Sequence, residues 1–337
     1  MCGLRAACCQ QGPGKLSRLS ERGWGVAVQG LVDYSNGQQD TTRWGRFKFR
    51  PDDIVISTPP KCGTAWTQML CGLLLLDASR FPGSIDELSP WLDLTFRTEQ
   101  DVFAGLDAQQ HRRFIKTHTP LDGIPVRDDV TYLVVGRDPR DAMVSFEYHF
   151  ANVDFSKVAA SYEAQGRLEE LESTPPPAPP ETDPDANFRM FIDHDGFGTF
   201  APTLQSVLHH LDTAWQQRSQ SNIGMFHYAD YQQDLVGEME RLADVLGISV
   251  TRERLAELAP EAGLDRMRSR ASELAPEAFV YVDDRAFFRS GGSGEWAHRG
   301  TDADHQRYQQ RVNELVTADL GAWAHQGRLA SGVDPSL

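Results

Sequence analysis

Hydrophobic residues follow two patterns along the chain, and the two patterns alternate. Short runs of β-branched and aliphatic residues predict buried strands, whereas longer stretches with apolar residues three and four positions apart predict helices. Strands are expected at 54–56, 113–118, 131–135 and 223–228. Helices are expected at 65–76, 142–150 and 233–246, the last one ended by a glycine.

This alternation indicates the fold class. Strands that alternate with helices predict an α/β protein with a central, mainly parallel sheet flanked by helices. Right-handed crossovers then bring the carboxyl ends of the strands to one edge of the sheet, where ligands bind. The loops that follow the predicted strands are therefore expected to share one site.

Three segments do not follow the pattern. Residues 1–40 are polar and rich in Gly and Gln, which predicts a poorly ordered N-terminal extension. Residues 163–186 contain many prolines and acids, which predicts a mobile surface loop without helix or strand. Residues 285–301 are rich in Gly, Ser and Arg and predict a second loop. Both loops are interpreted as insertions in a single domain, expected at 41–330.

Composition narrows the function classes. The chain has 337 residues, of which 40% are hydrophobic, enough for the core of one large domain. Its net charge of −15 argues against a general nucleic-acid or anionic-membrane binder, but permits a local basic pocket. Five cysteines without zinc spacing, no signal peptide and no membrane-length apolar run predict a reduced, cytoplasmic protein. The Ala, Arg and Asp bias favours a bacterium with a GC-rich genome.

The segment TPPKCGTAW at 58–66 joins a predicted strand to a predicted helix. A helix that opens there directs backbone N–H groups and the positive end of its dipole at the loop. Gly63 permits close backbone approach, Thr64 offers a hydroxyl and Lys61 adds a full charge. This arrangement predicts an anion site, although the GxxxxGK[ST] motif is absent. The alternative for this segment alone is a turn with an exposed lysine.

Three further segments carry groups suited to phosphate binding or proton transfer. Arg137 ends a predicted strand and Ser145 follows in the next helix, and a guanidinium binds phosphate oxygens in pairs. Arg289 lies in a Gly/Ser-rich segment, and His118 follows a strand as a candidate general base. Read alone, these residues also fit a helix terminus with Arg–Asp pairs, a solvated loop and a structural histidine.

Together and in this order, the four segments resemble the cytosolic-type sulfotransferase family. The chain reads TPPKCGTAW, KTHTP, GRDPRDAMVSFEYHF and FRSGGSGEWAHRGT. The family has a YPKSGTTW-like loop, then KTH, RNPKDxxVSxYHF and RKGxxGDWK. The resemblance spans roughly residues 44–301. It implies transfer of a sulfuryl group from 3′-phosphoadenosine 5′-phosphosulfate (PAPS) to an acceptor hydroxyl or amine, on an α/β fold related to P-loop nucleotide kinases.

The resemblance also implies a role for each matching residue. The phosphosulfate of PAPS is expected at Lys61, Cys62, Gly63, Thr64 and Ala65. The adenine is expected at Trp66 and Tyr228. The 3′-phosphate is expected at Arg137, Ser145, Arg289, Ser290 and Gly291. His118 is then the base and Lys116 supports the transition state, while Lys61 neutralises the leaving phosphate without a metal.

Several residues depart from the family pattern. Cys62 stands where the family has Ser, Ala65 where it has Thr, and Ser290 where it often has Lys. A hydrogen bond to a charged group contributes roughly 1.5–3 kcal/mol, so weaker donor binding is expected. One alternative is therefore a PAPS-binding protein, or one that binds the product 3′,5′-adenosine bisphosphate (PAP), with weakened catalysis. A P-loop kinase is disfavoured because GK[ST] is missing.

The acceptor pocket is expected between 81–103, 152–200 and 279–288. These segments supply aromatic and aliphatic residues: Phe81, Trp91, Leu92, Phe96, Phe103, Phe150, Phe155, Phe197 and Phe200. Such a lining suits a lipophilic alcohol, a phenol or a glycolipid, although each residue fits core packing equally well. Nothing in the sequence indicates the oligomeric state.

Overall fold

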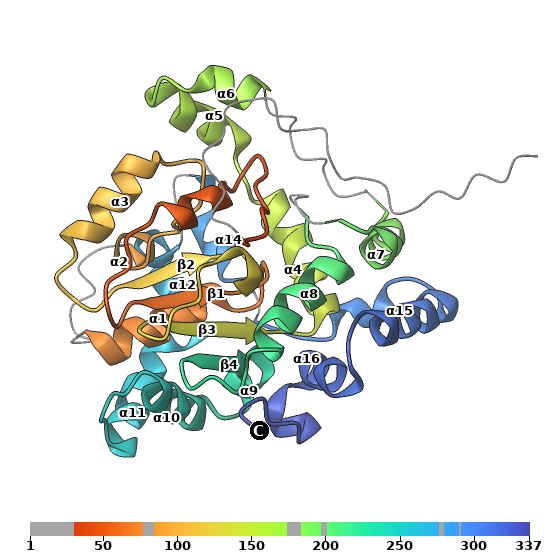
Figure 1. Cartoon of the computed structure of the whole chain (residues 1–337). Helices are drawn as coiled ribbons and strands as arrows, with labels where there is room; N and C mark the ends of the chain where they lie inside the picture. Colours follow the sequence, from red (N-terminus) through yellow and green to blue (C-terminus); the bar gives the residue numbers. More distant parts are fainter. Residues whose placement is uncertain (1–29, 77–83, 174–182, 197–200, 276–279, 290) are drawn as a thin grey trace, which may run out of the picture.

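The computed structural model describes residues 30–76, 84–173, 183–196, 201–275, 280–289 and 291–337. A four-stranded parallel sheet lies at its centre, in the order β2-β1-β3-β4 (Figure 1). The strands are β1 (Ile54–Ser57), β2 (Phe114–Thr117), β3 (Thr131–Gly136) and β4 (Ile223–His227). The predicted α/β class and all four predicted strands are confirmed.

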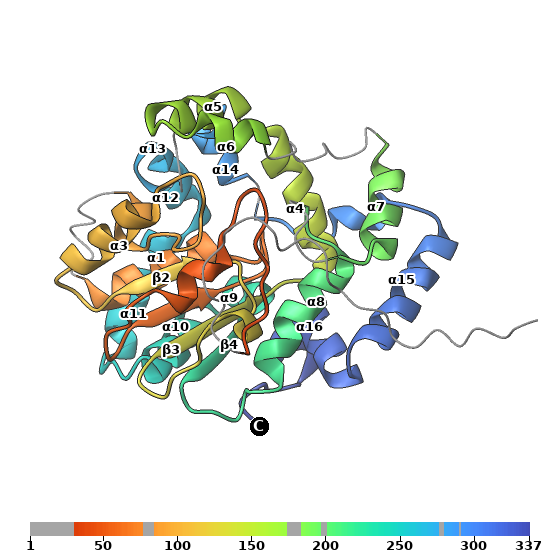
Figure 2. The ribbon, with the colours of Figure 1, turned by 45° about the horizontal axis from the view of Figure 1, so that its top comes forward.

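The strands are buried on both faces, which explains their continuous apolar sequences. Ile54 and Ile56 pack on one face with α1 (Thr64–Leu75) and α10 (Leu235–Val245). Val55 packs on the other face with α8 (Leu204–Trp215) and α16 (Ala318–Ser331). Figures 1 and 2 show these two helix layers on opposite sides of the sheet.

Most of the remaining elements belong to one of these two helix layers. The first layer also contains α2 (Ile85–Leu88), α11 (Arg252–Leu258), η3 (Ala259–Ala262), α12 (Leu264–Ser269) and α13 (Ala271–Leu274). The second also contains η1 (Thr41–Gly45), α3 (Glu99–Ala108), η2 (Leu121–Gly123), α4 (Pro139–Ala151), α7 (Pro184–Asp193) and α15 (Asp302–Leu315). The other elements are α5 (Phe155–Ala164), α6 (Leu168–Ser173), α9 (Tyr228–Gln233), α14 (Asp284–Phe287) and η5 (Glu295–His298).

Local sequence sets the start of the helices that lead from the strands. Asp138 caps α4 by accepting a hydrogen bond from the Arg140 N–H, and Pro139 occupies the first helical turn. The strand predicted at 223–228 ends one residue earlier, because Tyr228 begins α9. Tyr228 therefore lies just after the carboxyl end of β4.

Three sequence predictions about irregular segments need correction, and the first concerns 285–301, which contains most of α14 and all of η5. The range 163–186 contains α6 and the start of α7, so the prediction that it forms no helix is wrong. Arg167 anchors α6 by donating to the Thr95 carbonyl at 2.8 Å and pairing with Glu170. Residues 30–40 also lie against the body, where the Val32 N–H donates to the Asp122 carbonyl. Residues 1–29 and 174–182 lie outside the described residues.

The predicted domain limits of 41–330 stay a prediction. Within the described ranges, no helix is long and apolar enough to cross a bilayer.

Candidate active site

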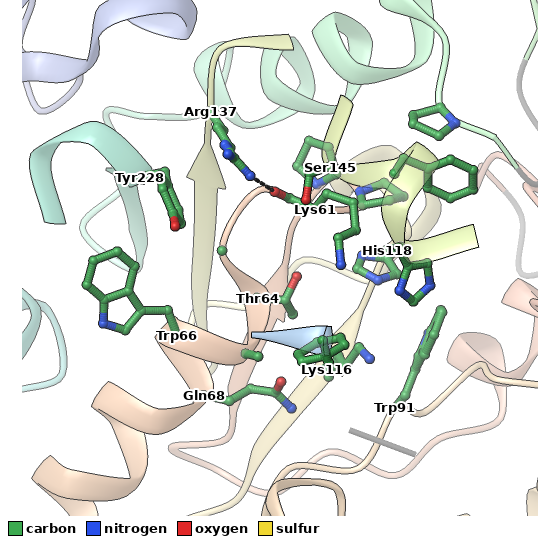
Figure 3. Close-up of a pocket in the computed structure, with 18 of the residues that line it drawn as sticks. Lys61, Thr64, Trp66, Gln68, Trp91, Lys116, His118, Arg137, Ser145 and Tyr228 are labelled. Carbon is green, nitrogen blue, oxygen red and sulfur yellow. Dashed lines mark hydrogen bonds between the residues drawn. The ribbon is translucent and has the colours of Figure 1, made fainter. Parts of the chain in front are cut away.

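The four motif segments meet at the carboxyl edge of the sheet around one cavity of ≈ 630 Å³ (Figure 3). Most of the residues predicted for the site line it: Lys61, Gly63, Thr64, Ala65, Trp66, Lys116, His118, Arg137, Ser145, Tyr228, Arg289 and Gly291. Cys62 is buried and does not line the cavity, and Ser290 lies outside the described residues. The sequence therefore predicted this cluster from segments far apart in the chain.

The loop between β1 and α1 presents the open end of a helix to the cavity. Gly63 precedes α1 with φ of 98°, and no side chain within the described ranges caps this end. A Cβ at Gly63 would lie 3.1 Å from the Tyr228 ring, so both backbone and space favour glycine. Lys61 also has positive φ, 68°, which is costly for a residue with a side chain. The loop thus directs N–H groups and the helix dipole at one point.

Cys62 contributes less than the sequence predicted. Its N–H already donates to the Pro59 carbonyl at 3.3 Å, inside the loop itself. Burial raises the pKa of its thiol to about 12, so it stays protonated near neutral pH. The Cys62 amide is therefore already used within the loop, whereas Lys61, Gly63 and Thr64 line the cavity.

Arg137 joins three of the motif segments. Its guanidinium donates to the Lys61 carbonyl at 3.2 Å (Figure 3) and to the Gly292 carbonyl at 2.9 Å. It also lies 4.4 Å from the centre of the Tyr228 ring. Its buried Nε has no hydrogen-bond partner in the described part of the chain. Because two of its donors hold backbone, Arg137 orders the site as well as charging it.

The cavity concentrates positive charge in an acidic protein. Burial and the neighbouring Arg137, Lys116 and Arg289 lower the pKa of Lys61 to about 7. The described lining contains no Asp or Glu side chain. Arg289 is partly neutralised, because it pairs with Glu295 at 2.7 Å. Such a set of cations without carboxylates favours a ligand with several negative charges.

His118 is held as a neutral imidazole. Its Nδ1 lies 2.7 Å from the Thr58 carbonyl, which only accepts, so Nδ1 carries the proton and Nε2 is left as an acceptor. Burial and the nearby Lys116 hold its pKa well below 6.5. The Trp91 ring lies edge-on at 4.6 Å, and the Lys116 Nζ lies 4.1 Å from the same ring. An unprotonated nitrogen thus faces a cavity whose charged side chains are all cations in the described lining.

The predicted acceptor residues divide into three groups. Trp91, Phe96 and Phe155 line the cavity as expected. Leu92, Phe103 and Phe150 do not line it, since Leu92 and Phe103 pack in the core and Phe150 packs against Phe155. Phe81, Phe197 and Phe200 lie outside the described residues. Alternating or clustered apolar residues do not distinguish a cavity wall from a core.

Sequence reasoning missed several polar residues of the site. Gln39, Gln68 and His149 line the cavity, and burial together with Lys61 and Lys116 holds the pKa of His149 well below 6.5. Asp93 is buried and accepts hydrogen bonds from Thr117 and Thr119, the two residues that flank His118. Only His149 had a signal, since it lies within the motif segment GRDPRDAMVSFEYHF, which follows the third strand. The others become part of the site through tertiary contacts.

Solved structures of known proteins share this fold. The structure of retinol dehydratase in complex with androsterone and inactive cofactor PAP covers 82% of this chain and 84% of its own, with a TM-score of 0.62 and 21% identity. Mouse sulfotransferase SULT7A1 complexed with PAP covers 82% and 88%, with a TM-score of 0.60 and 21% identity. The fold is thus shared with sulfotransferases of known structure.

Sequence comparison is more specific. A family model described as the sulfotransferase domain matches residues 51–320. The glycolipid sulfotransferase of Mycobacterium bovis (strain BCG / Pasteur 1173P2) is 46% identical over 318 residues, covering 90% of this chain and 97% of the relative. The chain therefore belongs to the sulfotransferase domain family and is a PAPS-dependent sulfotransferase.

Proposed function

We propose that the cavity holds PAPS through the β1–α1 loop and the cations around it, and transfers its sulfuryl group to a glycolipid hydroxyl. The residues fit such a donor. The uncapped N-terminus of α1 and Lys61 suit the phosphosulfate, while Arg137, Ser145 and Arg289 suit a second phosphate. Trp66 and Tyr228, with ring centres 5.2 Å apart, suit the adenine. When bound, PAPS would supply the sulfuryl group, and its phosphate would be the leaving group.

One observation carries the proposal: a neutral imidazole opens onto the same cavity as the cations. His118 Nε2 takes the proton of the acceptor hydroxyl as its oxygen attacks sulfur. Lys61 and the amides at the start of α1 neutralise the charge that grows on the departing phosphate. Lys116, the second cation assigned to the reaction, supports charge on the transferred group. Each of these groups is held in place before the acceptor arrives.

The acceptor side of the cavity supports a lipid-linked substrate. Its walls include Trp91, Phe96, Phe155 and Tyr281, which offer a large apolar surface. The Mycobacterium bovis relative is named a glycolipid sulfotransferase and is similar over nearly its whole length. A glycolipid combines the apolar part that these walls suit with a hydroxyl for His118.

The test separates the base from the rest of the site. We expect His118→Asn, which keeps a donor toward the Thr58 carbonyl but lacks Nε2, to lower transfer from radiolabelled PAPS to glycolipids by roughly 10²-fold or more. PAP affinity, measured by calorimetry, should stay within about twofold because the cation cluster is intact. His111→Asn, outside the cavity, serves as the control. Full transfer by His118→Asn would contradict the assigned base.

A further inference from the structure

Two glutamine side chains on the acceptor side of the cavity contain buried polar atoms without a partner. Gln68 is fully buried, and its Nε2 donates to the Ser89 carbonyl at 2.9 Å. Its Oε1 has no hydrogen-bond partner among the described residues. The Nε2 of Gln39 is likewise buried and unpartnered there. Both side chains line the cavity, so a ligand bound there would complete them.

Both glutamines are attached to the same short segment, residues 89–94. Gln68 holds its start through Ser89, and Gln39 pairs with its end through a bridge to Leu94. Trp91 lies between them and pairs with Lys116. Figure 3 shows Gln68 on the same side of the cavity as Lys116 and Trp91. Gln68 and Gln39 are therefore attached near the two ends of the segment whose Trp91 ring contacts His118.

The two unpartnered atoms are complementary in chemistry. Gln68 Oε1 only accepts a hydrogen bond, and Gln39 Nε2 only donates one. A hydroxyl group does both. A lone alcohol or phenol would give its only hydroxyl to His118 and leave both amides unsatisfied. An acceptor with further hydroxyls close to the reacting one would satisfy them.

We propose that Gln68 and Gln39 form a hydroxyl-binding subsite that selects polyhydroxylated acceptors, such as a sugar headgroup, over lone alcohols and phenols. This inference rests on the proposed acceptor role of the cavity. The amides position the acceptor and take no part in proton transfer. A site built to bind a substrate hydroxyl discriminates strongly against an analogue that lacks it, because its own buried groups are then left unpaired.

Two acceptors with the same alkyl chain test the subsite: n-octyl β-D-glucoside and 1-octanol. We expect the unaltered protein to prefer the glucoside by at least about tenfold in kcat/KM. Gln68→Met, which keeps the volume but loses the amide, should lower kcat/KM for the glucoside about tenfold and leave 1-octanol within about twofold. Gln39→Met should also lower kcat/KM for the glucoside more than for 1-octanol. This variant replaces Gln68→Met in the test if Gln68→Met does not fold.

Gln109→Met is the matched control. Gln109 also has a buried Oε1 without a partner in the described ranges and also donates to backbone, but it does not line the cavity. It should change the thermal midpoint without changing the preference between acceptors. Equal loss with both acceptors in Gln68→Met, or no preference in the unaltered protein, would overturn the subsite.

Calorimetry in the presence of PAP distinguishes this inference from the proposed transfer. Glucoside binding that exceeds octanol binding, and that loses this advantage in Gln68→Met, supports the subsite even without turnover. Transfer to both acceptors at equal kcat/KM would support the transferase and refute the subsite.

Discussion

Single residues of the site have chemical states that their sequence does not reveal. Lys61 is the main case, because its pKa of about 7 differs from the usual value near 10.5. Burial and three neighbouring cations disfavour the ammonium form when no anion is bound. A bound polyanion reverses this effect, because opposite charge stabilises the ammonium form. Lys61 should therefore couple nucleotide binding to pH.

We predict that PAP binding takes up a proton at Lys61. The pKa rises on binding, so affinity is highest below pH 7 and falls as pH rises from about 7 toward the pKa of the complex. Calorimetry at pH 8 in buffers of different ionisation enthalpy should show uptake of about 0.9 proton. Lys61→Arg, which stays charged, should bind without this uptake. Uptake that persists in Lys61→Arg would assign the proton to another group.

At the scale of elements, the β1–α1 junction decides where an anion can bind. The strand ends, the chain turns through two residues with positive φ, and α1 begins without a side-chain cap. The sequence predicted this strand, loop and helix within one or two residues. It did not reveal that Cys62 directs its amide back into the loop, because that depends on the loop's own fold.

Gly63→Ala tests this junction. The new methyl group would be strained at φ of 98° and would press on the Tyr228 ring. We expect PAP affinity to fall at least about tenfold and stability to fall by about 1–3 kcal/mol. Gly247→Ala is the control, because Gly247 has φ of 66° with open space around it and lies outside the cavity. It should lose stability but keep PAP affinity, as calorimetry and thermal unfolding would show. Equal affinity in both variants would contradict the assigned cradle.

At the scale of the whole molecule, the two ends of the sheet have different roles. The site lies at the carboxyl ends of the strands, whereas Arg113 and Asp53 form an ion pair before their amino ends. Both side chains are only 1% exposed, and Arg113 also donates to the Lys48 carbonyl. This pair fixes the entry of β1 and β2 into the sheet without contact to the cavity.

Arg113→Met should therefore lower the free energy of unfolding by about 3–5 kcal/mol, because Asp53 is left buried without its partner. Transfer per folded molecule should stay within about twofold. Arg252→Ala, which removes an exposed pair with Glu240, should change stability by less than about 1 kcal/mol. Denaturant unfolding measures the stability of each variant, and a transfer assay at low temperature measures its activity. Retained stability in Arg113→Met would show that the pair contributes little.

The sequence by itself determined the strands, the main helices and the order of the motif segments. These features depend on local periodicity and on residue types, whereas the strand order β2-β1-β3-β4 came from the structure. Tertiary structure alone decided which apolar residues form walls and which form core, as Phe96 and Phe103 show. It also decided that Gln39 and Gln68 attach to the same segment, residues 89–94, and that burial shifts the pKa values of Lys61 and His118. The burial of a side chain and the electrostatic potential around it depend on residues from distant parts of the chain. A local sequence pattern does not contain this information.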